Sequence, residues 1–198
     1  YLHNIKQIKI DIMKTKKFFS ALLIFGFMVT SVSAIHINEI ERLPYFETEE
    51  QTPTIVGVAA SNENFTTLVA AVKAANLVET LNSAGPFTVF APMNSAFDKL
   101  PAGTVESLLK PENIKTLTAI LTYHVVAGEF KAAAVVAAIK ENNGSFVIPT
   151  VQGGKLTASI KDGNVMLTDE KGNSSKIILT DVEASNGVIH AIDTVVMP

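Results

Sequence analysis

Apolar and polar residues alternate from Phe87 to Ala91, and the spacing of the apolar residues then lengthens from two to about 3.6. This change predicts a strand that runs directly into a short helix. Pro92 has no amide donor and is expected to end the strand, and Asn94 or Ser95 can cap the helix. The expected faces are Phe87, Val89 and Ala91 on one side of the strand, Thr88 and Phe90 on the other, and Phe97 with Leu100 on the buried side of the helix.

Several segments between residues 65 and 121 have the spacing of amphipathic helices. Thr104 is placed to cap one of these helices. Lys131 to Lys140 is rich in alanine and favours another helix, although its β-branched residues leave a strand open. The other expected helical segments are 65–72, 77–81, 105–109 and 114–121.

From Ser145 onward, glycine-containing turn signals separate short runs that are typical of antiparallel strands. The run that begins at Lys155 alternates apolar and polar residues, which predicts one solvent-exposed face, whereas the last run is apolar on both faces and is expected to be central. Asn186-Gly187 tolerates positive φ and is expected to form the turn into that last strand. The predicted strands are Phe146–Val151, Lys155–Lys161, Asn164–Thr168, Lys176–Val182 and Val188–Val196. Helices followed by strands predict an α+β fold.

Three separated motifs resemble the signature of fasciclin (FAS1) domains of the secreted, single-domain type found in bacteria. Thr88–Phe97 resembles the first signature segment, Tyr123-His124 the central Tyr-His motif, and Asn186–Asp193 the closing segment. The motifs occur in the family's order, and the likeness covers residues 54–198. The resemblance implies a β-sandwich or wedge of about seven strands flanked by several short helices. It also implies an extracellular module that binds its partner non-covalently.

The N-terminal third of the chain has the features of an export signal followed by a tether. The first Met is Met13, so residues 1–12 are expected to be untranslated upstream sequence. Residues 13–34 combine a basic head, an apolar run and a small residue at Ala34, which predicts a signal peptide and a secreted or periplasmic destination. The apolar run is shorter than the roughly 20 residues that span a bilayer, which disfavours a membrane anchor. Residues 35–53 are acidic and lack apolar periodicity, as in a solvated linker.

Composition excludes several classes of function. The chain has no Cys, which rules out disulfides, thiolate catalysis and thiolate metal sites. From Ile35 to Pro198 the sequence has 11 Lys plus Arg and 18 Asp plus Glu, a formal net charge of −7. This charge opposes binding to nucleic acid or to anionic lipid.

His124 is the residue with the widest choice of roles, because it lies where a predicted helix meets a strand. It could be a general base, a metal ligand or a buried hydrogen-bonding group, and the last role is favoured. A serine triad with Ser95 and Asp98 is disfavoured, because no nucleophile-elbow motif surrounds the serine. Asp98 is expected instead to pair with a nearby donor. A metal site of His124, His190 and Asp193 is disfavoured, because the last two would point to opposite faces of a strand.

The resemblance implies that the signature residues hold the fold and shape a binding face, with no catalytic residue, metal or cofactor. An integrin-type motif in the stretch from Asp193 to Val196 is disfavoured, because that stretch is expected to lie in a central strand. The expected partner is a cell-surface protein, a matrix protein or a polysaccharide, with neither nucleic acid nor stable membrane insertion. The alternatives are a carrier of a hydrophobic ligand such as a carotenoid and, third, an extracytoplasmic hydrolase. The residues expected to matter are Thr88, Phe90, Pro92, Asn94, Phe97, Asp98, Tyr123, His124, Asn186, Gly187, His190 and Asp193.

Overall fold

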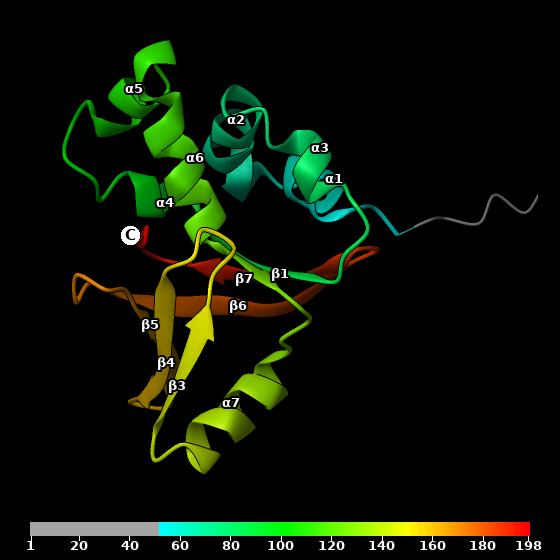
Figure 1. Ribbon diagram of the computed structural model, residues 1–198, viewed down its shortest axis with the longest axis vertical. Helices are drawn as coiled ribbons and strands as arrows, with labels where there is room; N and C mark the ends of the chain where they lie inside the picture. The colour runs from blue at the N-terminus through cyan, green and yellow to red at the C-terminus, as the bar shows by residue number, and fades with distance from the viewer. Residues whose placement is uncertain (1–51) are drawn as a thin grey trace, which may run out of the picture. The chain divides into compact units, whose positions relative to one another are not determined.

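The computed structural model of the protein describes residues 52–198 (Figure 1). The predicted untranslated leader, the signal peptide and nearly all of the linker lie outside the described residues. Helices occupy most of the described chain up to residue 123, and strands most of the part after residue 144. The helices are α1 (Ile55–Ala60), η1 (Glu63–Phe65), α2 (Thr66–Ala74), α3 (Val78–Leu81), α4 (Asn94–Phe97), α5 (Thr104–Leu108), η2 (Pro111–Asn113), α6 (Ile114–Tyr123) and α7 (Ala132–Glu141).

The strands belong to one sheet of seven, in the order β2-β1-β7-β6-β5-β4-β3. β1 and β7 run parallel, and every other neighbouring pair is antiparallel. The Val151 N–H, just after β3, donates to the Val125 carbonyl at the start of β2 (2.8 Å), so the sheet comes close to closing on itself. The strands are β1 (Phe87–Pro92), β2 (Val125–Ala127), β3 (Ser145–Pro149), β4 (Lys155–Lys161), β5 (Asn164–Thr168), β6 (Ser174–Ala184) and β7 (Gly187–Ile192).

The two faces of β1 border two different hydrophobic cores, as its alternating pattern predicts. Val89 and Ala91 pack with α1, α2 and α6 in one core. Phe90 belongs to the other core, with residues of α7 and of the strands β3 to β5. Figure 1 shows the same division, with α1 to α6 gathered on one side of β1 and β7 and α7 on the other. The expected α+β wedge of about seven strands and short helices is confirmed.

Several local expectations were wrong. Neither Asn94 nor Ser95 caps α4, because Met93 is the residue before that helix and no side chain caps it. Thr104 is the first residue of α5 and does not cap it either; Gly103, with φ of 79°, precedes it. The last strand ends at Ile192 rather than Val196, so Asp193 lies beyond it. The Ala-rich segment left open as helix or strand is the helix α7.

Candidate functional site

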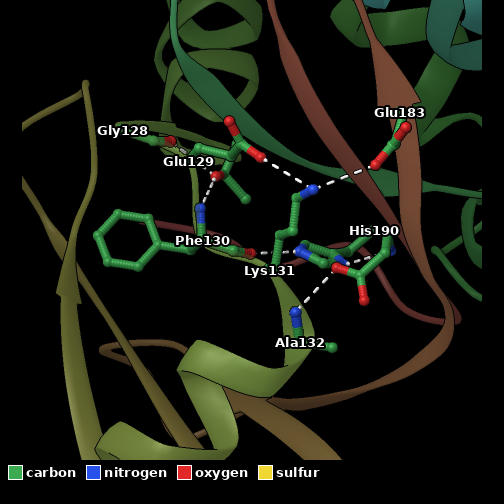
Figure 2. A network of polar contacts seen from close by, with 9 residues as sticks. Gly128, Glu129, Phe130, Lys131, Ala132, Glu183 and His190 are labelled. Atoms are coloured by element: carbon green, nitrogen blue, oxygen red, sulfur yellow. Dashed lines mark hydrogen bonds and ion pairs between the residues drawn. The ribbon is translucent and has the colours of Figure 1, made fainter. Parts of the chain in front are cut away.

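Thr88 and His190 together hold the segment that connects β2 to α7. Figure 2 shows His190 beside this segment. The buried Thr88 hydroxyl donates to the Gly128 carbonyl (2.7 Å) and accepts from the Phe130 N–H (2.8 Å). The Nε2 of His190, on β7, lies 2.7 Å from the Phe130 carbonyl, and its Nδ1 accepts from the Asp181 N–H at 3.2 Å. These partners fix one neutral tautomer, with the proton on Nε2. The ring also stacks on Phe90 at a centroid distance of 5.7 Å.

Asp181 extends this network to the N-terminus of α7. Its carboxylate accepts from the Ala132 N–H at 2.8 Å, which satisfies one of the amides that a helix leaves unpaired at its start. Asp181 has φ of 56° and lies where the pairing of β6 with β7 shifts register. Lys131 forms exposed ion pairs with Glu129 (3.4 Å) and Glu183 (3.1 Å) beside it (Figure 2). Such exposed pairs contribute little stability, so Asp181 is the main polar anchor of the helix.

Tyr123 is fully buried at the end of α6, where it joins α6 to the turns around β4 and β5. Its hydroxyl donates to the Lys155 carbonyl (2.6 Å) and accepts from the Glu170 N–H (3.3 Å). Burial raises the pKa of this hydroxyl, which therefore stays protonated at neutral pH. The ring packs on Gly154, where a Cβ would lie 2.8 Å from the Tyr123 Cε2. Gly154 is thus a partner of the Tyr-His motif that the sequence analysis missed.

His124 is 2% exposed, and both of its ring nitrogens contact backbone groups. Nδ1 lies 2.8 Å from the Ile120 carbonyl, and Nε2 accepts from the Val196 N–H at 3.3 Å. Burial lowers the pKa of the imidazole to about 4, although the hydrogen bond to Ile120 opposes this shift. His124 is therefore neutral at pH 7 and has no free nitrogen for a substrate proton or a metal. The expected buried, hydrogen-bonded role is confirmed.

The rest of the first signature segment positions helices. Pro92 ends β1 and is buried, and Phe97 packs in the small core around Ala96. The Asn94 amide accepts from the Thr67 N–H (3.0 Å) and donates to the Glu63 carbonyl (2.8 Å), so it caps α2 rather than its own helix. Asp98 is exposed, and its carboxylate has no hydrogen bond or ion pair with any described residue. The expectation that Asp98 pairs with a nearby donor was wrong.

Asn186 and Gly187 do more than make a turn. The Asn186 amide accepts from the Ile55 N–H (2.9 Å) at the start of α1 and donates to the Leu81 carbonyl (2.7 Å) at the end of α3. Ala184 pairs directly with Gly187, so the turn residues are 185–186, and only Gly187, with φ of 153°, has the expected positive φ. A Cβ on Gly187 would overlap the Phe87 carbonyl of the neighbouring parallel strand β1.

Asp193, the last signature residue, ties the end of β7 to β6 and to the region after α4. Its carboxylate accepts from the Lys176 N–H (2.8 Å) and pairs with the Lys99 ammonium (3.0 Å). Burial raises its pKa, but these contacts outweigh burial and hold the pKa below its usual value. Val195 and Val196, which follow it, are buried. The stretch is not in a central strand as expected, yet its valines are still inaccessible to an integrin.

The arrangement supports neither of the disfavoured chemical sites. His124 contacts backbone groups instead of Ser95 or Asp98, so the serine triad is not assembled. Within residues 52–198, no three His, Asp or Glu side chains form a group that could hold a metal ion. An apolar cavity of about 30 Å³ lies between α1, α2 and the face of β1 and β7, with Ile55, Val72 and Ile189 among its lining residues. It has room for about two water-sized spheres.

Of the twelve residues expected to matter, six are buried and Asp98 alone is exposed. Most of them donate to or accept from backbone groups of other elements. The structure therefore brings Thr88, Phe90 and His190 together on one side of the sheet, while Asn94, Asn186 and Asp193 act at three separate junctions. Among the described helices, none is long and apolar enough to cross a membrane.

Comparison with known proteins agrees with this geometry. The Fasciclin domain family model matches residues 63–198. The chain is 48% identical over 182 residues to the protein sll1483 of Synechocystis, and this match covers 91% of this chain and 94% of that protein. It is 36% identical over 149 residues to the cell surface glycolipoprotein MPB83 of Mycobacterium bovis, covering 73% of this chain and 60% of that protein.

Among solved structures, the fold is similar to that of a FAS1 domain pair from the insect cell adhesion molecule Fasciclin I. The TM-score is 0.65 and the sequence identity 20%, and the match covers 75% of this chain and 52% of that chain. At this identity the likeness concerns the fold alone.

Proposed function

Because the chain belongs to the fasciclin domain family, we propose that it acts outside the cytoplasm as a module that binds a cell-surface protein, a matrix protein or a polysaccharide non-covalently. The proposal rests on one observation: all but one of the twelve signature residues are buried or half-buried in the domain. Apart from the exposed Asp98, their polar side chains are hydrogen-bonded to backbone groups of other elements, so they specify the fold and leave binding to exposed side chains.

Export is part of the proposal and depends on the signal peptide predicted at residues 13–34. A relative that is 36% identical is a cell surface glycolipoprotein, which supports an extracytoplasmic destination. The insect protein of similar fold is a cell adhesion molecule, which is the kind of activity proposed here.

The carrier alternative receives less support. Pockets for small ligands typically measure about 300–1,000 Å³, whereas the apolar cavity beside α1 and α2 has a volume of about 30 Å³. A carotenoid would need the helices to move away from the sheet. A hydrolase would need a general base other than His124, whose ring nitrogens are both occupied.

The experiment that tests the proposal uses the exported protein, purified without detergent and applied to an array of matrix proteins and of neutral and anionic glycans. Its absorption spectrum is recorded on the same sample. We expect a colourless protein that binds one class of array member saturably. A visible chromophore without binding would replace the proposal by the carrier function, and a colourless protein that binds nothing on the array would contradict it.

A further inference from the structure

One face of the strands β3, β4 and β5 and of the first residues of β6, 174–176, carries only lysine as a charged residue. The strand registers place Ser159 opposite Ser145 and Met166, and Met166 opposite Lys176, so these side chains share a face. We call it the lysine face. Its members are Ser145, Val147, Pro149, Lys155, Thr157, Ser159, Lys161, Asn164, Met166, Thr168, Ser174 and Lys176.

The lysine face points to solvent. The opposite face of the same strands holds Ile148, Leu156 and Leu167, all with no exposed surface, and packs against α7. No member of the lysine face is buried, and Val147 is 51% exposed. The helix and core therefore cover one side of these strands and leave the other side open among the described residues.

The charge of this face is opposite to that of the domain. Residues 52–198 contain 13 Asp plus Glu and ten Lys, whereas the face contains three Lys and neither Asp nor Glu. Within the described residues, none of Lys155, Lys161 and Lys176 forms an ion pair. The carboxylates at the rim are those of Asp162, Glu170 and Asp193, and the last is paired with Lys99. The lysine ammonium groups are thus available to an external anion.

The other side chains of the face indicate the chemistry of its partner. The face has five hydroxyl groups, on Ser145, Thr157, Ser159, Thr168 and Ser174, which can donate to and accept from sugar hydroxyls. It has no aromatic ring, which disfavours both the stacking of neutral sugar rings and the binding of single-stranded nucleic acid. Standard strand spacing places Lys161 and Lys176 roughly 12 Å apart, within reach of one extended polymer.

We propose that the lysine face binds an anionic polysaccharide, with the lysines pairing with its carboxylate or sulfate groups and the hydroxyls with its sugar oxygens. This inference rests on the proposed function and narrows its partner to a charged glycan. The affinity is expected to fall as salt rises, because exposed charges are screened.

The test compares binding of the exported protein to alginate, dextran sulfate and uncharged dextran at physiological salt. A double charge reversal, Lys161→Glu with Lys176→Glu, removes the complementarity of the face. The matched control, Lys110→Glu with Lys115→Glu, makes the same change in net charge at two exposed lysines before and within α6, which likewise form no ion pair with described residues. Binding to a short duplex DNA is measured as a control, because it detects binding to any polyanion regardless of its sugar chemistry.

We expect binding to alginate or dextran sulfate but not to dextran, and a loss of at least about tenfold in the face variant. The control variant should bind within about twofold of the parent. Preference for alginate or for dextran sulfate distinguishes carboxylate from sulfate as the anion. Equal losses in the two variants, equal binding to dextran, or binding to DNA as strong as to either glycan would overturn the inference. If a neutral glycan or a protein of the array binds parent and face variant alike, the inference fails while the proposed function stands.

Discussion

At the residue scale, His124 makes the stability of the domain depend on pH in a specific window. The folded state holds the imidazole neutral with a pKa of about 4, against 6.5 for an unperturbed histidine. The unfolded chain therefore binds the proton more tightly, and stability falls as pH decreases from about 6.5 to about 4. The difference corresponds to about 3 kcal/mol of unfolding free energy. Above pH 6.5 this contribution is constant.

The pH prediction is tested with His124→Asn, whose amide can still donate to the Ile120 carbonyl but cannot titrate. Urea unfolding followed by circular dichroism suits a chain without Trp. The variant should be less stable than the parent at pH 7.5, and the difference should shrink as the pH falls from 6.5 to 4. A difference that is the same at every pH would show that His124 is not the titrating group.

The role of a residue could be predicted where neighbouring residues in the sequence determine it. It could not be predicted where the hydrogen-bond partner lies far away in the sequence. The junction of a helix and a strand correctly predicted a buried His124. Asn94 was assigned to its own helix because its true contacts, at Glu63 and Thr67, lie about 30 residues earlier in the chain. The contact of Asn186 with Ile55 spans 131 positions and leaves no local signal.

At the element scale, the position of α7 depends on the bulged strand β6. Asp181→Ala removes the carboxylate that accepts from Ala132 and also places Ala at a φ of 56°. It should destabilise the domain by about 2 kcal/mol, from the lost cap and from the strain of the left-handed backbone. The loss should be concentrated in α7, whose amides should exchange faster with solvent than those of α6. Hydrogen exchange with mass spectrometry resolves the two helices.

Asp181→Asn is the matched control, because Asn retains an acceptor oxygen and also tolerates the positive φ at this position. It should retain most of the protection of α7. Uniformly faster exchange over all helices in Asp181→Ala, or none in α7, would refute the local anchoring role.

Turn residues predicted the bounds of some strands, whereas β6 extends two residues beyond its predicted range at each end. β4 and β5 match their predicted ranges because Gly154 and Asp162-Gly163 flank β4, and Gly172-Asn173 follows β5. The parallel pairing of β1 with β7 was not predicted, since it joins segments about 100 residues apart. The alternation of β4 did predict its exposed side, and that side belongs to the lysine face.

At the scale of the whole molecule, the signature motifs lie on or beside the neighbouring parallel strands β1 and β7, and the two cores lie on either side of them. Thr88 and His190 link these strands to the segment before α7, and Asn186 links them to α1 and α3. Substitutions in the motifs should therefore change stability throughout the domain. Binding should be changed by exposed residues such as Lys161 and Lys176.

The central claim, that the signature maintains the fold while exposed side chains bind, is tested most directly by measuring array binding of Thr88→Val. Valine has nearly the same shape as threonine but leaves the Gly128 carbonyl and the Phe130 N–H without a partner, at a cost of about 2–4 kcal/mol. Binding is measured at a temperature where circular dichroism shows parent and variant equally folded. The account predicts a lower melting temperature with the same ligands and unchanged affinity. A folded variant that has lost the parent's ligand would contradict it.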